Sequence, residues 1–560
     1  MKQLIECVPN FSEGRDLSII KQITDAIESV DGVKLLDVDP GKATNRTVVT
    51  FVGEPSAVIE GAFRGIKKAG ELINMRTHRG EHPRMGATDV CPLIPIAGIS
   101  MEETAAFAHQ LAKRVGEELN IPCYMYESAA TTPERSNLAT VRAGEYEGLV
   151  QKLRDSNWKP DYGKAEFNAQ SGATVIGARD FLVAYNVNLN TTSVRRANSV
   201  AFDVREQGRV LRDGDPISGE VKTDENGEPI RIEGACKAVK GIGWYIEEYG
   251  LAQVSMNLTN INITALHTVF EECCKSADVH GLRVTGSELV GLVPKKVLTD
   301  AGRYFLAKQR RSVGVGDDEL IRIAVKTLGL DELSLFDPKR RIIEYQLEAD
   351  QKTPLLDMNL KAFAIETASE SPAPGGGSIA AYVGALGISL ATMVANLSSH
   401  KRGWDERWSE FSEYASSGQA LKDDLLHFVD EDTKAFNGIM DAFSLPKSSA
   451  DEKQLRSIAI QAATRMAIEI PFRVMQRAMA SFEIIKAMAE IGNPNSVTDA
   501  GVGALCARAA VHGAYMNVKV NAGSLKDKDY VADVLSKGDA MCKEADRLEQ
   551  AISTLVYSKI

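Results

Sequence analysis

The sequence lacks the features that mark several classes of protein. Its eight cysteines are scattered, with no C-x-x-C pair and no zinc-ligand spacing, so we expect reduced thiols in a cytoplasmic protein. The formal net charge of -11 leaves no overall positive field that could hold nucleic acid or anionic lipid. The N-terminal residues contain no apolar signal core before they become polar at Asn10, so we expect no export.

The sequence also lacks a clear membrane-spanning segment. Residues Ile379 to Leu397 carry no charge and are nearly long enough to cross a bilayer. Ser389, Thr392 and Asn396 interrupt this run, which is otherwise rich in glycine and alanine. We therefore predict a buried helix of an α-helical bundle and no membrane span.

The length and the residue pattern predict a multidomain protein. A chain of 560 residues is too long for one hydrophobic core. Up to about Leu330, short β-branched runs alternate with amphipathic helical patterns, and after about Met358 the pattern is helical almost throughout. We expect an α+β N-terminal part followed by an all-α helical-bundle C-terminal domain.

The first part contains a rhythm of strands and helices. We predict strands at Lys34 to Asp39 and Thr47 to Val52, and helices at Ala57 to Leu72 and Glu102 to Glu118. This order is typical of a ferredoxin-like βαββαβ unit.

The same rhythm recurs further along the chain. Strands are predicted at Phe181 to Leu189 and Ala252 to Leu258, and helices at Val194 to Arg205 and Leu266 to Ala277. We therefore expect two ferredoxin-like subdomains side by side, divided at about residue 180.

The remaining boundaries follow from composition. The first subdomain is predicted at residues 1–179, the second at 180–333, a charged linker at 334–357 and the helical domain at 358–560. In the helical domain Ser378 follows a Pro-Gly-Gly-Gly turn and is expected to cap the uncharged helix. The other long helices are predicted near Asp405 to Phe443, Asp451 to Ile491, Val497 to Val520 and Asp529 to Val556.

One loop, Arg76 to Asp89 (RTHRGEHPRMGATD), gathers two histidines, three arginines and two acids. Its His78-x-x-Glu81-His82 core matches an inverted zinc-protease pattern, but the neighbouring glycine and proline make the required helix improbable. A metal-free interpretation uses a neutral imidazole as general base and the arginines as carboxylate clamps. A solvated basic loop is the structural alternative.

A second candidate lies in the helical domain. On a helix of 3.6 residues per turn, Asp432 falls within an apolar stripe that includes Phe428, Phe436 and Phe443, whereas Asp430 points to the opposite side. Burial raises the pKa of an inward aspartate towards a value useful in acid catalysis. A helix-to-helix hydrogen bond explains the same pattern.

Two further features leave alternatives open. The helix beginning near Val497 aligns small residues with Asp499, Asn517 and Asn521, which indicates either close helix packing or the wall of a ligand cleft. The glycine-rich turn before Ser378 could cradle an anion with its backbone amides, or simply lead into a helix.

The chain resembles the formimidoyltransferase-cyclodeaminase family along nearly its whole length. The first half carries ECVPNFSEG at 6–14, Asn45-Arg-Thr47, the segment from Arg79 to Pro95, GATVIGAR at 172–179 and GIGWY at 241–245. The second half carries SPAPGGGS at 371–378, VDED at 429–432, LPK at 445–447 and Gly492-Asn493. Together these motifs are far more specific than any one of them.

The resemblance implies roles for individual residues. His82 is implied as the catalytic histidine of the transferase, and Asp432 as the catalytic acid of the cyclodeaminase. Asp39, Arg46, Arg79 and Arg84 are supporting candidates at the transferase site. Two segments are implied to bind folate; they contain Gly163, Lys164, Ala165, Glu166, Phe167, Asn168, Ala169, Gln170, Ser171 and Gly172, and Cys236, Lys237 and Ala238.

The implied function is a two-step folate reaction in histidine breakdown. A formimino group passes from formiminoglutamate to tetrahydrofolate, and the product is closed to 5,10-methenyltetrahydrofolate with loss of ammonia. The resemblance implies polyglutamated tetrahydrofolate as substrate, no metal and a ring-like homo-oligomer. The alternatives are a C-terminal domain that acts mainly as a methenyltetrahydrofolate cyclohydrolase, and a non-catalytic folate-binding scaffold.

Overall fold

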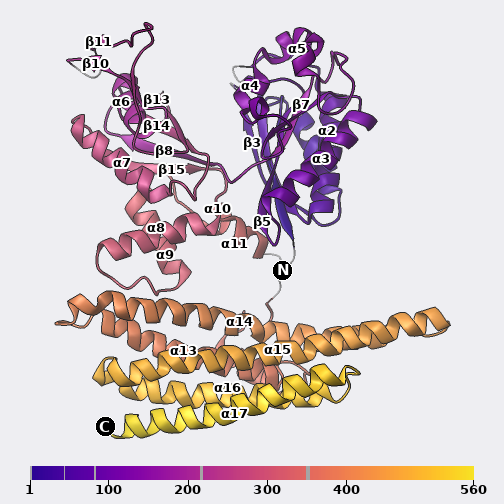
Figure 1. Ribbon diagram of the computed structural model, residues 1–560, viewed down its shortest axis with the longest axis vertical. Helices are drawn as coiled ribbons and strands as arrows, with labels where there is room; N and C mark the ends of the chain where they lie inside the picture. The colour runs from indigo at the N-terminus through magenta and orange to yellow at the C-terminus, as the bar shows by residue number, and fades with distance from the viewer. Residues whose placement is uncertain (1–2, 43, 81–82, 215–217, 349–352) are drawn as a thin grey trace. The chain divides into compact units, whose positions relative to one another are not determined.

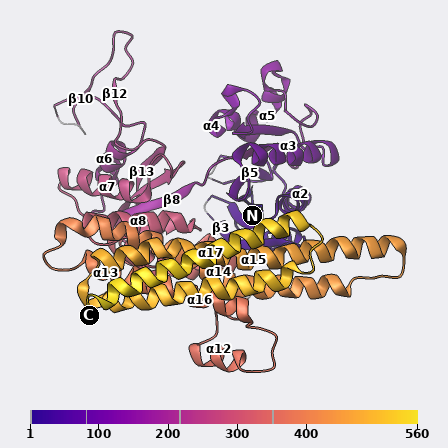
Figure 2. The same ribbon diagram turned by 60° about the horizontal axis from the view of Figure 1, so that its bottom comes forward.

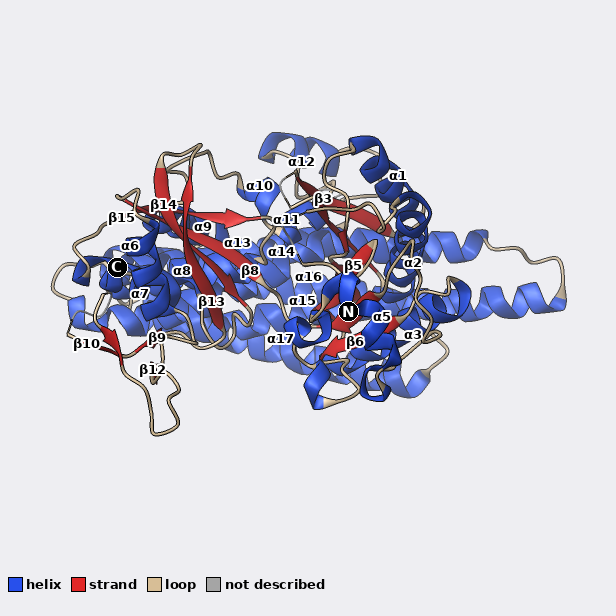
Figure 3. Ribbon diagram, turned by 90° about the horizontal axis from the view of Figure 1, so that it is seen from above, coloured by secondary structure: helices blue, strands red, loops and turns tan. Residues whose placement is uncertain are grey.

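The structure is a computed structural model that describes residues 3–42, 44–80, 83–214, 218–348 and 353–560. The chain divides into two compact units. Unit 1 comprises Met1–Val297 and Leu328–Gln346, and unit 2 comprises Leu298–Thr327 and Leu347–Ile560. The N-terminal region is α/β and the C-terminal region is helical, as predicted (Figure 3).

Unit 1 begins with a seven-stranded sheet in the order β1-β4-β2-β5-β7-β6, with β3 paired to β4. Its strands are β1 Leu4–Cys7, β2 Asn10–Phe11, β3 Val33–Gly41, β4 Arg46–Gly53, β5 Thr88–Ala97, β6 Cys123–Glu127 and β7 Thr174–Ala178. Its helices are α1 Leu17–Glu28, α2 Pro55–Leu72, α3 Met101–Glu118, α4 Leu138–Arg142 and α5 Glu145–Arg154. The strands and helices predicted between residues 34 and 118 are confirmed as β3, β4, α2 and α3 (Figure 1).

The two faces of this sheet differ in chemistry because side chains alternate along a strand. On β4, Val49 and Phe51 are buried and join the core that α1, α2 and α3 build against one face. Arg46, Val48 and Thr50 point to the other face. The helices are fixed at their starts: the Ser100 and Glu103 side chains, for example, form a capping box at α3. One face is therefore left available for a ligand.

The second half of unit 1 has a four-stranded antiparallel sheet in the order β13-β14-β8-β15. Its main elements are β8 Val183–Leu189, α6 Val194–Val204, β13 Val239–Ile246, β14 Leu251–Leu258, α7 Leu266–Val279 and β15 Val284–Val290. The four elements predicted here are confirmed as β8, α6, β14 and α7. Four short strands lie between α6 and β13: β9 Arg209–Val210, β10 Arg212–Asp213, β11 Glu220–Val221 and β12 Arg231–Ile232.

The segment predicted as a linker contains two short helices, α10 Pro338–Arg341 and α11 Ile343–Glu348. Ile342 between them and Ile343 at the start of α11 are buried, and the Ile343 N–H donates to the Val293 carbonyl, also in unit 1. The helices α8 Lys295–Lys308 and α9 Asp317–Leu328 precede this segment, and residues 298–327 belong to unit 2.

The helical region confirms the five predicted long helices, which run side by side in Figure 2. After α12 Leu360–Thr367 they are α13 Gly376–Ser399, α14 Trp408–Ser444, α15 Ala450–Ile491, α16 Val497–Ala522 and α17 Lys528–Tyr557. α13 is central, and its small residues permit close packing: a Cβ at Gly387 would lie 2.9 Å from the Gly503 carbonyl oxygen of α16. Among the described residues, α13 alone is long and apolar enough to span a membrane, and 61% of its most apolar window is buried.

Two expectations about this region are wrong. Gly375, not Ser378, is the N-cap of α13, and Ser378 lies inside the first helical turn. The apolar stripe of α14 is only partly buried: Phe428 is in the core, but Phe436 and Phe443 are 48% and 50% exposed. A helical projection identifies a shared face, but it does not show where that face leaves the bundle.

Candidate active sites

A cleft of about 430 Å³ lies in unit 1 on the sheet face that the helices leave open. Alternate residues of the first sheet form one wall, including Glu6, Asp37, Asp39 and Arg46. The other wall comes from the second subdomain, near the start of β8 and the ends of β14 and β15. The predicted site residues Asp39 and Arg46 therefore face the same cleft.

Charged groups of both signs line this cleft. Arg46, Arg142 and Arg179 contribute three guanidinium groups, and Glu6 and Asp37 contribute carboxyl groups beside Asp39. Burial lowers the pKa of Arg46, against the raising effect of Asp89, because a desolvated cation is disfavoured. Such a site can bind an anion in a fixed orientation while keeping groups that exchange protons.

Glu6 is the most perturbed of these groups. It is only 4% exposed, and burial raises its pKa from 4.5 to about 7, which Arg179 opposes and Glu344 supports. Burial and neighbouring Asp39 also raise the pKa of Asp37. A carboxyl group with a pKa near 7 can give or take a proton at neutral pH.

The loop from Arg76 to Asp89 lies beside this cleft. The buried Asp89 carboxylate accepts the Met85 N–H at 2.9 Å and pairs with Arg142 at 2.7 Å. A Cβ at Gly80 would lie 2.2 Å from the Thr44 carbonyl oxygen, so the loop passes tightly against the turn that leads to Arg46. Glu81 and His82, between Gly80 and Pro83, lie outside the described residues.

His78, the other histidine of the loop, is buried and is held in place by hydrogen bonds. Its Nε2 lies 2.9 Å from the Asn45 carbonyl oxygen, and the Nε of Arg84 donates to its Nδ1 at 3.3 Å. Because Nδ1 accepts, Nε2 carries the proton, and the ring is neutral in one tautomer. Burial is the main cause that lowers the pKa of His78, which agrees with a neutral ring.

The two predicted arginine clamps of this loop have different surroundings. Arg84 is buried and pairs with Glu145 at 3.0 Å and with Glu147 at 2.8 Å. Arg79 is exposed and donates to the His78 carbonyl at 2.7 Å. Arg84 is therefore already paired with two carboxylates, whereas Arg79 faces solvent.

The predicted folate segment Gly163 to Gly172 is hydrogen-bonded to both ends of the loop. The Met75 N–H donates to the Gln170 carbonyl, and the Ala87 N–H donates to the Ser171 carbonyl. Gly172 has a φ of +67°, and a Cβ there would lie 2.2 Å from the Met85 carbonyl oxygen, so only glycine fits. The structure thus brings two predicted regions together.

Within this segment, the side chains divide into anchors and exposed groups. Asn168 accepts the N–H groups of Gln170 and Ser171 and shapes the turn. The Phe167 ring contacts Tyr146, with 5.4 Å between ring centroids. The side chains of Lys164, Ala165 and Glu166 are exposed and could meet a ligand.

The second predicted folate segment, Cys236 to Ala238, lies in the other subdomain. Cys236 is buried, and Lys237 is exposed and pairs with Glu233 at 2.6 Å. Ala238 adopts a positive φ of 54° and donates its N–H to Glu206. These partners all belong to the second subdomain.

Asp432 of α14 occupies a separate site in unit 2. It faces the start of α13, where a Cβ at Gly377 would lie 2.1 Å from the Asp432 Oδ1. Burial raises the pKa of Asp432, although the Ser378 backbone N–H and hydroxyl oppose this rise. The carboxyl group is thus held against a helix N-terminus while burial favours its protonated form.

Two other polar residues have different positions: Asn517 lies at the same helix start as Asp432, whereas Asp430 binds the backbone of another segment. Asn517 of α16 reaches the same helix start, with its Nδ2 3.6 Å from a Cβ built at Gly376. Asp430, predicted to face away, is 3% exposed and accepts the backbone N–H groups of Leu355 and Leu356. Asp430 is therefore buried, whereas Asp432 is half-buried, and Asp430 is committed to holding the chain that enters the bundle.

The His-x-x-Glu-His pattern of the loop raises the question of a metal site. No group of three histidine, cysteine or acidic residues is arranged to hold a metal ion within the described residues. That pattern is not covered by this finding, since Glu81 and His82 lie outside the described part.

The sequence did not single out several residues of the cleft. Glu6 and Arg179 lie inside recognised motifs but received no role, and Arg142 lies on a short helix without a recognisable motif. Alternation along β1 and β4 was the available signal for Glu6. The pairing of Arg142 with Asp89 joins residues 53 apart and could not be read from local pattern.

Comparison with known proteins gives three family-model matches. They are the "Formiminotransferase domain, N-terminal subdomain" over residues 4–179, the "Formiminotransferase domain" over 184–348 and "Formiminotransferase-cyclodeaminase" over 359–540.

Individual relatives match the whole chain or one part of it. The chain is 42% identical over 546 residues to formimidoyltransferase-cyclodeaminase of Mus musculus, covering 97% of each chain. It is 42% identical over 305 residues to glutamate formimidoyltransferase of Thermoplasma acidophilum, covering 54% of this chain and 92% of that protein. It is 33% identical over 201 residues to methenyltetrahydrofolate cyclohydrolase of Methylorubrum extorquens, covering 36% of this chain and 97% of that protein.

Proposed function

Because the chain belongs to the formimidoyltransferase-cyclodeaminase family, we propose that it catalyses two successive folate reactions. The first transfers the formimino group from N-formimino-L-glutamate to tetrahydrofolate and gives glutamate and 5-formiminotetrahydrofolate. The second cyclises this product to 5,10-methenyltetrahydrofolate and releases ammonia. The observation that carries the proposal is the full-length match, which includes both the transferase and the cyclodeaminase parts.

The transferase reaction fits the cleft of unit 1. Formiminoglutamate carries two carboxylates, and planar guanidinium groups bind carboxylates in a bidentate way. Arg46, Arg142 and Arg179 line the cleft, and exposed Arg79 lies on the adjoining loop. We assign Arg46 and Arg79 to substrate binding, with Asp39 as a supporting group, and Arg84 to holding the loop through Glu145 and Glu147.

His82 is assigned the proton transfers of the first reaction. The N5 amine of tetrahydrofolate attacks the amidine carbon and loses a proton, and the departing glutamate nitrogen gains one. A single imidazole can accept the first proton and return it to the second nitrogen. His78 is committed to Asn45 and Arg84, which supports His82 as the loop histidine available for this role.

The cyclodeaminase reaction is assigned to the site around Asp432. N10 attacks the formimino carbon, forms a bond to it and loses its own proton. The bond between that carbon and the departing nitrogen breaks as this nitrogen is protonated and leaves as ammonia. The raised pKa of Asp432 suits a carboxylic acid that donates this proton. Gly377 leaves the space that the carboxyl group needs, and Asn517 adds an amide at the same helix start.

A second candidate function for the C-terminal part is hydrolysis of methenyltetrahydrofolate. The relative from Methylorubrum extorquens, a methenyltetrahydrofolate cyclohydrolase, favours it because 97% of that protein aligns with this part of the chain. Supplying 5-formiminotetrahydrofolate and, separately, 5,10-methenyltetrahydrofolate distinguishes the two functions. Fast ammonia release from the first with slow hydrolysis of the second supports cyclodeaminase, and the reverse order supports cyclohydrolase.

The alternative to an enzyme is a non-catalytic scaffold that binds folate. One steady-state assay with formiminoglutamate and tetrahydrofolate tests it, because glutamate and ammonia are both products of the proposed reactions. Turnover supports the enzyme, and folate binding without either product supports the scaffold.

The finer features of the family are also proposed for this chain. We propose that both halves of unit 1 are ferredoxin-like βαββαβ subdomains, at residues 1–179 and 180–333; the strand order β13-β14-β8-β15 supports this for the second. The helical domain is proposed at 358–560. Folate binding is assigned to Gly163 to Gly172 and to Cys236 to Ala238.

The state of the substrate and of the protein is proposed as well. The substrate is proposed to be polyglutamated folate without a metal, and the exposed Lys164 in the folate segment supports an anionic tail. A ring-like homo-oligomer is supported by exposed apolar side chains of α16, with Leu505 and Met516 52% and 66% exposed. A cytoplasmic location is supported by the eight cysteines, which are all free thiols.

A further inference from the structure

A second cavity of unit 1 has a composition that the two proposed reactions do not use. It has a volume of about 530 Å³ and lies between α6 and the short strands β9, β10 and β12. These strands belong to the excursion between α6 and β13 that Figure 2 displays beside α6. The cavity shares no lining residue with the transferase cleft.

Five arginines line this cavity, and no acidic residue does so within the described part of the chain. They are Arg195 and Arg205 around α6, Arg209 on β9, Arg212 on β10 and Arg231 on β12. The protein has a net charge of -11, so its overall composition does not explain why five arginines line one cavity. Burial, together with the nearby charge of Arg231, lowers the pKa of Arg205, as expected when cations are held close together.

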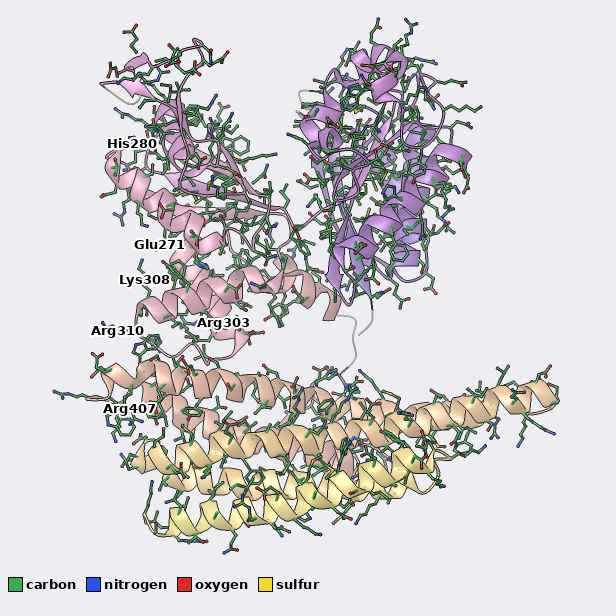
Figure 4. The ribbon with its side chains drawn as sticks, viewed as in Figure 1. Glu271, His280, Arg303, Lys308, Arg310 and Arg407 are labelled. Atoms are coloured by element: carbon green, nitrogen blue, oxygen red, sulfur yellow. The ribbon has the colours of Figure 1, made fainter. Side chains whose placement is uncertain are left out.

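The partners of these arginines leave most of the positive charge uncompensated. Arg209 pairs with Asp203, which also accepts from Ser276 and from His280 at the end of α7 (Figure 4). Arg205 donates to the Gly208 and Gly241 carbonyls. Neutral carbonyls satisfy hydrogen bonds but do not cancel a charge.

The other three arginines have no carboxylate partner among the described residues. Arg212 donates to the Gly219 carbonyl at 2.7 Å. Arg195 and Arg231 are exposed and make no ion pair in the part of the chain that the structure describes. Among the described residues, only Arg209 of the five is thus paired with a carboxylate.

The cavity is built to present guanidinium groups. The Arg205 guanidinium lies 4.0 Å from the centre of the Phe202 ring, which fixes its plane. The Arg209 Nη2 donates to the Ser199 carbonyl at 3.0 Å, while its buried Nε has no hydrogen-bond partner among the residues that the structure describes. Oriented guanidinium groups select carboxylates and phosphates, whose paired oxygens match the guanidinium fork.

We propose that this arginine-lined cavity binds a multiply charged anion that carries several carboxylate or phosphate groups. A single anionic group would neutralise one or two of the cations and leave the rest in mutual repulsion. An oligo-carboxylate and an oligo-phosphate share the chemistry that the cavity recognises. None of the residues that line the cavity is assigned above to the transferase or the cyclodeaminase reaction.

Isothermal titration calorimetry on the full-length protein tests this proposal with two probes, tripolyphosphate and a penta-γ-glutamate peptide. The Arg195→Gln/Arg231→Gln double variant removes two charges whose side chains support no other described contact. We expect the Kd of the tighter probe to rise at least about tenfold in this variant, and to rise with added salt. The probe with the lower Kd identifies the ligand class.

Arg196→Gln is the matched control, because Arg196 is an exposed neighbour on the same helix and does not line the cavity. Its Kd is expected to stay within about twofold of wild type. The proposal is overturned if neither probe shows saturable binding at millimolar concentration. It is also overturned if the double variant binds as tightly as wild type, or if the control loses as much affinity as the double variant.

Discussion

Replacement of Glu6 by glutamine tests the electrostatics of the cleft in unit 1. Glu6 is 4% exposed, and burial raises its pKa from 4.5 to about 7 in the folded protein. Between these pH values the folded protein holds the proton more tightly than the unfolded chain. The contribution of the protonated Glu6 carboxyl group to the unfolding free energy is therefore fully present below about pH 4.5 and is lost as the pH rises through about 7.

The size of this change in unfolding free energy follows from the shift in the pKa of Glu6. One pKa unit corresponds to about 1.4 kcal/mol, so the rise from 4.5 to about 7 corresponds to roughly 3 kcal/mol of unfolding free energy. Glutamine is neutral at every pH and keeps the size of the side chain. Relative to wild type, Glu6→Gln should therefore become more stable by about 3 kcal/mol between pH 5 and pH 8.

Differential scanning calorimetry of the full-length protein measures this effect. At about 2 °C per kcal/mol, the Tm of the transition of unit 1 in Glu6→Gln should gain roughly 6 °C on wild type over that pH range. Glu117→Gln, at an exposed position of α3, should follow wild type throughout. If Glu6→Gln also follows wild type at every pH, the carboxyl group of Glu6 is not perturbed by burial and the electrostatic account of the cleft is wrong.

Two further predictions concern the helical unit. Gly377→Ala places a Cβ 2.1 Å from the Asp432 Oδ1. The rate of ammonia release should therefore fall at least about tenfold, while the rate of formimino transfer is unchanged. Ammonia release at the wild-type rate would contradict this packing. Asp430→Ala leaves the Leu355 and Leu356 N–H groups without their acceptor and should cost about 1–3 kcal/mol. Calorimetry should show a lower Tm for the transition of unit 2, and an unchanged Tm would exclude the anchoring role of Asp430.

Much of the fold could be predicted from periodicity. The five long helices have a strong pattern over many turns, and the predicted ends of α15 and α16 lie within two residues of those observed. The strands β3 and β4 follow from β-branched runs around a polar turn. The short strands β9 to β12 have only two residues each, too few to produce a period.

The candidate sites were predictable to a smaller degree. The helical projection singled out Asp432 and placed Asp430 on the opposite side of the helix. It could not show that Asp430 is buried, because the chain that covers it comes from residues 74 and 75 positions away. The apolar stripe did not predict the burial of Phe436 and Phe443 correctly, because both side chains are about half exposed although they share a helical face with the buried Phe428. Contacts between residues that are distant in the sequence decide whether a side chain is buried, and a local sequence pattern does not contain this information.

One measurement on Asp432→Asn shows whether the two reactions use separate sites. The full-length variant is supplied with formiminoglutamate and tetrahydrofolate, and glutamate and ammonia are followed in the same reaction. Asp441→Asn, at an exposed position of α14, serves as the control. We expect Asp432→Asn to form glutamate at the wild-type rate, to accumulate 5-formiminotetrahydrofolate and to release no ammonia; equal loss of both products in a folded variant would contradict two separate sites.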